Sequence, residues 1–196
     1  LIEFNGNDAQ TIPTITTPFG YHDIAFSGAG IKTITSNALV QGDWLNNGNL
    51  NITLGTITFN GGSTQLIKGI NASTFNSVIV NNINGLVLNA DVSVVGSLTL
   101  SNGTIDLTNK ILTTTNAISI ASPSAAKMII ASGGGELRRL VSGTGNMVFP
   151  IGDTTNTAEY SPFQVNITSG TFDNAYVGVK VNDAKHPNNA SNTHFL

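Results

Sequence analysis

Carboxylates are the first side chains to consider for chemistry in this chain of 196 residues, which has eleven of them. Hydrolysis of a glycosidic bond needs two carboxyl groups about 5 to 9.5 Å apart, one of them acting as the acid. Here the carboxylates stand singly, and neither Asp43 and Asp91 nor Asp23 and Asp106 occupy equivalent positions of the repeat described below. We expect solvated turn residues, and we predict no catalytic, cofactor-binding or metal-binding residues.

Arginines and flat aromatic rings are the next candidates, because both can bind sugars. Arg138 and Arg139 form a dense charge cluster with Glu136. This cluster could contact a sulfate, a phosphate or a uronate, or it could simply be a solubilising patch, which we favour. Tyr160 and Trp44 are candidates for stacking on a sugar, although Trp44 aligns with an apolar repeat position, so core packing is the favoured role for it.

Metal chemistry finds little support in the sequence. His186 and His194 are too loosely spaced for a helical metal motif. For the adjacent His22 and Asp23 we favour a surface turn over a catalytic dyad. The chain has no cysteine, which excludes a disulfide framework and a thiolate metal site.

The composition excludes several classes of protein. Charged residues make up 10% of the chain, against about 25% in a typical soluble domain. Eight Lys and Arg residues cannot form the basic surface that a nucleic-acid partner requires. Helical bundles are equally disfavoured, because Glu, Lys and Arg solubilise their outer faces. No apolar run is long enough for a membrane-spanning helix, so we predict no membrane insertion.

The elements that carry these residues follow an internal repeat of about 55 residues. The first copy covers 1–55 and the second 56–110. The matched residues are Phe4-Asn5-Gly6, Gln10, Ile12 and Ile15 against Phe59-Asn60-Gly61, Gln65, Ile67 and Ile70. Within each copy apolar residues alternate with polar ones over runs of three to six residues, and Asn-Gly pairs bound these runs, as expected for short strands.

Two all-β architectures fit this pattern. Asn-Gly turns between alternating strands are typical of hairpins and would give an antiparallel sandwich. Stacked coils would instead place equivalent residues about 4.8 Å apart in a parallel solenoid. The repeat and the low charge favour the solenoid, because a charged residue repeated in every coil would lie against its own copy. We predict a right-handed parallel β-solenoid over 1–135, including one degenerate coil, and an antiparallel β capping module over 136–196.

The unit F-N-G-x-x-x-Q-x-I, followed by V-x-V and G-x-L-x-L, resembles β-helical repeats in large secreted proteins of Bacteroidetes. The stretch 145–152, with Tyr160-Ser161-Pro162-Phe163, is similar to the module that closes those repeats. The resemblance implies a secreted, extracellular or cell-surface protein of adhesin type, exported by type IX secretion, and it brings no catalytic residues. The ends of the chain suggest a piece of a longer polypeptide.

We therefore expect a non-catalytic structural or adhesive segment whose partners are glycans, solid or cell surfaces, and neighbouring domains of the same polypeptide. One alternative is an accessory carbohydrate-binding module of a secreted polysaccharide-degrading enzyme. A further alternative is a polysaccharide lyase, since parallel β-helices also host that activity.

Overall fold

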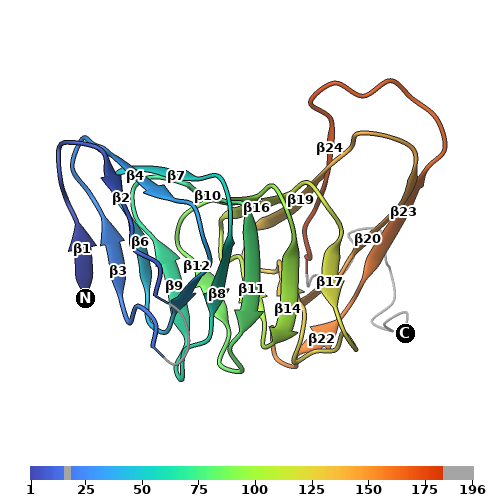
Figure 1. The fold of residues 1–196 in the computed structure, drawn as a ribbon. Helices are drawn as coiled ribbons and strands as arrows, with labels where there is room; N and C mark the ends of the chain where they lie inside the picture. The colour runs from blue at the N-terminus through green and yellow to red at the C-terminus, as the bar shows by residue number, and fades with distance from the viewer. Residues whose placement is uncertain (16–18, 183–196) are drawn as a thin grey trace.

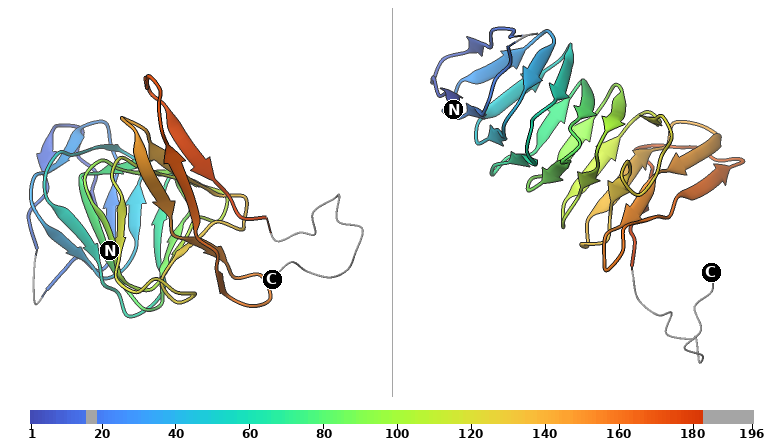
Figure 2. Two further views of the ribbon diagram at one scale, coloured as in Figure 1. Left: turned by 90° about the vertical axis from the view of Figure 1, so that its right-hand side faces the viewer. Right: turned by 90° about the horizontal axis from the view of Figure 1, so that it is seen from below.

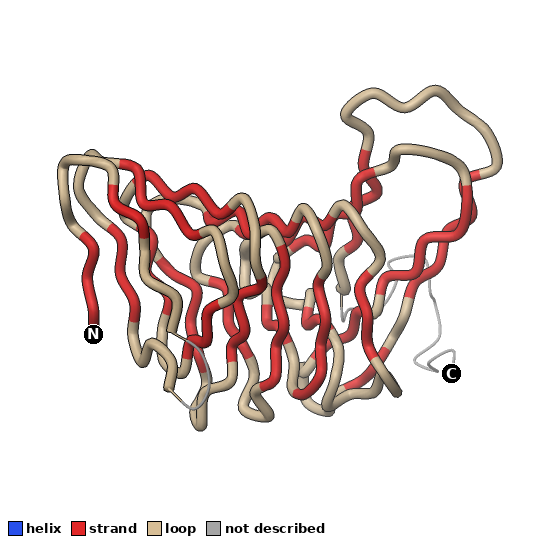
Figure 3. Tube along the Cα trace, in the orientation of Figure 1, coloured by secondary structure: helices blue, strands red, loops and turns tan. Residues whose placement is uncertain are grey.

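The computed structural model describes residues 1–15 and 19–182. All regular secondary structure in these ranges is β-strand (Figure 3). His186 and His194, from which we expect no metal site, lie outside the described residues. The strands stack along one axis, with the N-terminus at one end (Figures 1 and 2). The predicted all-β parallel solenoid is confirmed.

Each coil crosses three faces in the same order, and each face is built from strands of successive coils. The first face contains β1 (Ile2–Phe4), β3 (Ile24–Phe26), β6 (Trp44–Asn46), β9 (Gln65–Lys68), β12 (Leu86–Leu88), β15 (Ile105–Asp106), β18 (Ile129–Ile130), β21 (Ile151–Asp153) and β22 (Glu159–Tyr160). All of these pair in parallel except β21 with β22.

The second face is divided into two sheets. One contains β2 (Gln10–Thr11), β4 (Ile31–Ile34) and β7 (Asn49–Ile52). The other contains β10 (Ser73–Phe75), β13 (Val92–Val94), β16 (Ile111–Thr114), β19 (Glu136–Leu140) and β24 (Tyr176–Val179). The third face contains β5 (Ala38–Val40), β8 (Thr56–Phe59), β11 (Ser77–Asn81), β14 (Leu98–Asn102) and β17 (Ile118–Ile120).

One coil takes about 21 residues, not a simple fraction of the 55-residue repeat. On the first face Ile24, Trp44, Ile67 and Leu88 are register partners at spacings of 20, 23 and 21 residues. Two residues that are 55 positions apart therefore lie two coils apart, and the second of them is also two faces further along its coil. Phe4 lies on the first face and its repeat mate Phe59 on the third, so the two copies are not stacked face upon face.

The repeat is instead a corner motif that serves at more than one corner of the coil. The Gly6 N–H donates to Gln10 Oε1 at 2.9 Å, and the Gly61 N–H donates to Gln65 Oε1 at 2.8 Å. In both copies the glutamine four residues after the glycine closes the turn. The sequence similarity therefore reports a shared local turn, and it does not report the period of the coil.

The interior consists of apolar ladders that run along the stack. On the third face the ladder is Val40, Phe59, Val80, Leu100 and Ile120. At the N-terminal half the interior is aromatic, with ring centroids 4.8 Å apart for Phe26 and Trp44 and 5.0 Å for Trp44 and Phe75. Because each inward side chain contacts its counterparts in the coils above and below, successive coils share one continuous core.

Asparagine and aspartate side chains connect the coils at the corners, where backbone ladders stop. Side-chain Oδ1 atoms accept backbone N–H groups of the next coil at 2.8–3.3 Å, in the pairs Asn7–Ala29, Asp23–Asp43, Asn37–Thr56, Asn47–Ile70 and Asp91–Ile111. Amide Nδ2 atoms donate to carbonyls of the preceding coil at 2.9–3.1 Å, from Asn49, Asn71, Asn76, Asn84 and Asn116. These bonds satisfy turn backbone groups and explain the abundance of asparagine.

Parallel stacking continues beyond the predicted boundary at residue 135. β19 pairs in parallel with β16, and β21 pairs in parallel with β18. The glycines at 133–135, just before that boundary, form a corner: Gly134 has a φ of +90°, and the Gly135 N–H donates to Thr108 O at 3.0 Å. The antiparallel part is β20 (Gly145–Phe149) paired with β23 (Phe163–Ile167), β24 on β19, and β22 on β21.

The last coil lacks a strand on its third face. The first face continues to β21 and the second to β19, whereas the third face ends at β17. The chain between β19 and β21 leaves the coil as β20, which pairs with β23 and not with β17 (Figure 1). The inward side chains of Ile118 and Ile120 are consequently only half-buried. This gap gives access to the end of the core.

Candidate functional site

Trp44 is part of the core and not of a glycan-binding surface. Its exposed fraction is 0%, and its indole Nε1–H donates to Ser73 Oγ at 3.0 Å. The suggestion that Trp44 stacks on a sugar is therefore wrong, because the ring occupies an inward position of β6 between Phe26 and Phe75. The alternative interpretation, core packing, is confirmed.

Arg138 and Arg139 do not form one patch. Successive side chains of a strand point to opposite faces, so β19 directs Arg138 outward and Arg139 inward. Arg138 forms an ion pair with Glu136 and lies over the Tyr176 ring, with its guanidinium carbon 4.6 Å from the ring centroid. The Lys180 Nζ lies 3.5 Å from Glu136 Oε2. Arg138 thus already has a counter-charge and fastens β24 to β19.

These neighbouring charges change the pKa of the Glu136 carboxyl group. The hydrogen bond from Arg138 lowers the pKa of Glu136 below its usual value, and Lys180 acts in the same direction. The same contact raises the pKa of Arg138. This cluster is a structural ion pair at the solenoid end.

Arg139 occupies an inward ladder position that holds uncharged residues in the preceding coils. The ladder contains Phe75, Val94, Thr114 and Arg139 in successive strands. Arg139 is 8% exposed; its Nη1 donates to Val148 O at 3.1 Å, and its guanidinium carbon lies 5.7 Å from the Phe149 ring centroid. Burial lowers the pKa of Arg139, although a guanidinium remains charged in proteins.

A pocket of about 200 Å³ brings Arg139 and Tyr160 together at the gap between β17 and β20. Its walls combine apolar and polar groups from these strands and their neighbours, namely Ala117, Ile118, Ile120, Pro123, Arg139, Asn146, Val148, Pro150 and Tyr160. Burial raises the pKa of Tyr160, which keeps the phenol neutral and able to donate. Of the four residues predicted to contact glycans, the structure thus joins Arg139 and Tyr160, directs Arg138 away and buries Trp44 elsewhere. We name this cavity the Arg139 pocket.

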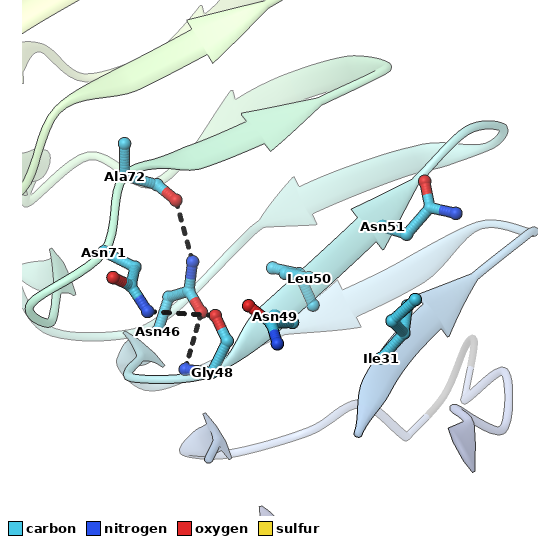
Figure 4. A pocket seen from close by; sticks show the side chains of 8 residues that line it. All are labelled: Ile31, Asn46, Gly48, Asn49, Leu50, Asn51, Asn71 and Ala72. Carbon is cyan, nitrogen blue, oxygen red and sulfur yellow. Dashed lines mark hydrogen bonds between the residues drawn. The ribbon is translucent and has the colours of Figure 1, made fainter. Parts of the chain in front are cut away.

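A second cavity, which the sequence analysis did not predict, lies where the second face is divided. β7 is the last strand of one sheet and β10 the first strand of the other. The groove beside them has a volume of about 540 Å³ and is lined by Ile31, Asn46, Gly48, Asn49, Leu50, Asn51, Asn71 and Ala72 (Figure 4). We name it the asparagine groove. All of its lining residues are uncharged.

The amides of the asparagine groove are held in place by the backbone. Asn46 is buried, with Nδ2 donating to Ala72 O at 2.8 Å and Oδ1 accepting the Gly48 N–H at 3.2 Å (Figure 4). Asn71 Nδ2 donates to Gly48 O at 3.1 Å. Asn51 is exposed and outward on β7. Fixed amides beside the half-exposed Ile31 offer hydrogen bonds and an apolar contact to a neutral ligand.

The stack does bring one pair of carboxylates together. Ile24 and Trp44 are register partners, so the preceding residues Asp23 and Asp43 lie on adjacent coils. Asp23 Oδ1 accepts the Asp43 N–H at 2.8 Å, while Asp43 accepts from Leu66 N at 2.9 Å and Lys68 Nζ at 2.6 Å. The bond from the Asp43 backbone lowers the pKa of Asp23, whereas a general acid needs a raised pKa. These carboxylates connect coils, and their register could not be read from the repeat.

Two further observations concern the described residues, 1–15 and 19–182. They contain no group of three or more His, Asp or Glu side chains arranged to hold a metal ion. Within the same ranges there is no helix of the length and apolarity needed to cross a bilayer.

Comparison with known proteins gives no match: no protein-family model, no curated protein and no solved structure is significantly similar to this chain. The class that the fold defines is a parallel β-solenoid with an antiparallel end.

Proposed function

We propose that this chain is a non-catalytic structural and adhesive segment of a large extracellular protein, of the surface type found in Bacteroidetes. Its outer faces would hold neutral glycans or solid surfaces. The chain would then act through many weak contacts arrayed along a stiff stack.

The outward ladders are the observation that carries this proposal. On the third face the outward register is Leu39, Thr58, Ile79, Thr99 and Ser119, which contains no charge. On the second face Thr74, Ser93 and Thr113 follow one another in the same way. Parallel strands repeat about every 4.8 Å, so the three second-face hydroxyl groups form a regular row, whereas on the third face hydroxyl and aliphatic side chains share the row. A regular neutral surface suits a regular neutral polymer.

Stiffness follows from the corner bonds. Each Asn or Asp bond at a corner joins residues about 20 positions apart, so a coil cannot separate from the next without losing backbone, core and side-chain contacts together. The asparagine groove adds a concave place on the same second face, where polymer hydroxyls could pair with fixed amides.

The proposal is tested by co-sedimentation of the purified chain with insoluble neutral polysaccharides. We expect retention by at least one of them and a clear loss in Asn51→Asp, which places a charge in the asparagine groove. The matched control is Asn156→Asp, which makes the same change in an exposed turn between β21 and β22, outside the outward ladders. Absence of retention on every polymer, or equal retention by Asn51→Asp and the unmodified chain, contradicts the groove as the contact.

The accessory carbohydrate-binding module is the second candidate, and the Arg139 pocket is the observation that favours it. Such a module would show the same retention but would need a specific, saturable sugar site. A sugar site in that pocket would act independently of the adhesive role of the outer faces.

A further inference from the structure

The Arg139 guanidinium is a buried charge that the fold leaves without a counter-charge. No carboxylate of the described residues lies within 4.0 Å of it, since the ion pairs at this end join Glu136 to Arg138 and Lys180. Its Nε is buried and makes no hydrogen bond with any described residue. Thr114 Oγ1, in the same ladder, is also buried and unpaired among these residues. A buried charge without a partner is costly to a fold.

Arg139 is not needed to prevent a further strand from adding to the second face. An inward charge at the end of a sheet can prevent another strand from adding to it. Here β24 already covers the edge of β19 in antiparallel pairing. An apolar residue at position 139 would therefore leave no exposed edge on this face.

The geometry points to a binding site for the carboxylate of a uronic-acid sugar residue in the Arg139 pocket. A guanidinium matches a carboxylate through paired N–H donors, and the donors of Asn146 and Tyr160 lie in the same walls. The walls contain no Asp or Glu that would repel an anion. Ile118, Pro150 and Tyr160 offer apolar surface for the ring of the sugar.

The size of the pocket limits the ligand. A volume of about 200 Å³ is below the roughly 300–1,000 Å³ of sites for drug-sized molecules. The pocket therefore suits one sugar ring, at a chain end or on a side branch. The gap left by the missing third-face strand supplies the opening, between β17 and β20.

The site is tested by titrating glucuronate and galacturonate into the chain by calorimetry, with glucose as the neutral control. We expect saturable binding of at least one uronate and none of glucose. Asn146→Asp places a carboxylate in the pocket beside Arg139, and we expect at least a tenfold weaker affinity for the uronate. Arg138→Gln, which changes the outward arginine, should leave the affinity unchanged.

Thermal unfolding supplies a readout that needs no ligand. Because Asn146→Asp would give the buried guanidinium its missing counter-charge, its melting temperature should equal or exceed that of the unmodified chain. No uronate binding by the unmodified chain, or equal binding by Asn146→Asp, would overturn the proposal. Binding of a peptide with a free C-terminal carboxylate in place of any uronate would also overturn it, by making the partner a protein.

Discussion

Single side chains in this solenoid act between coils. Gln65 shows this most fully, because its Oε1 accepts from Gly61 N and Asn82 Nδ2, while its Nε2 donates to Val40 O and Gly42 O. The residue is 1% exposed, and all of its hydrogen-bonding groups are occupied. One buried amide thus joins the corners of three successive coils.

Replacement of Gln65 by leucine should lower the free energy of unfolding by about 2–4 kcal/mol, because buried backbone groups lose their partners. Gln10, the equivalent glutamine of the first copy, is only half-buried, and one side-chain bond, from Gly6 N, is present among the described residues. Gln10→Leu should cost less than about 1 kcal/mol. Chemical denaturation of both variants gives the comparison, and equal losses would refute the assigned difference.

The positions of some single residues could be predicted from the sequence, and those of others could not. The alignment of Trp44 with an apolar repeat position correctly placed it in the core. The adjacency of Arg138 and Arg139 suggested one cluster, yet strand alternation separates them, and that alternation was visible in the sequence. The stack of Asp23 on Asp43 could not be predicted, because coil register depends on coil lengths, which vary from 20 to 23 residues on the first face.

At the scale of elements, short strands are held in place by turns that approach one another closely. Alternation of apolar and polar residues predicted strands such as β14 and β23 well. The 55-residue repeat did not give the coil length, because two different corners of the coil use the same local turn. Parallel pairing continues past the predicted boundary at 135, because the glycines at 133–135 form a corner that leads into β19.

Gly103 tests the tight contact between turns. Its φ is +77°, and a Cβ added there would lie 1.8 Å from Asn82 O. Gly103→Ala should therefore lower the free energy of unfolding by about 2–3 kcal/mol. Gly62→Ala is the matched control, because an added Cβ meets nothing within 4 Å there and its φ is not in the left-handed region. An equal response of both variants in denaturant titrations would show that this turn can relax.

The attachment of β24 to β19 should depend on pH. The pKa of Glu136 is lowered in the folded chain, chiefly by Arg138. The folded state therefore binds fewer protons than the unfolded state, so this stabilisation is complete above the unfolded pKa of about 4.3 and is lost as the pH falls through the lower folded value.

Melting temperatures of the unmodified chain and Glu136→Gln should thus differ at pH 7 and converge towards pH 3. The exposed Glu159 provides a control, since Glu159→Gln removes a carboxylate on β22 outside this cluster. A difference between Glu136→Gln and the unmodified chain that stays constant from pH 7 to pH 3 would contradict the ion-pair assignment.

At the scale of the whole molecule, low charge and stacking belong together. The outward rows on the second and third faces contain neutral residues over most of their length, so side chains of successive coils lie against one another without charge repulsion. Most charges lie at corners, at the ends or on the outside of the first face, where Asp43 and Lys68 pair at 2.6 Å. Lys32 on β4 is an exception, because it is buried and its Nζ donates to Gly6 O and Gly30 O. Such a surface fits contact with a neutral polymer, as proposed above.

The most direct test of the proposed function is to measure soluble sugar released from a broad polysaccharide panel by the chain, together with the amount of chain retained. The account predicts retention without product: no new reducing ends and no unsaturated sugars above the protein-free control. Release of either product in proportion to the amount of protein would contradict it and would make the solenoid an enzyme.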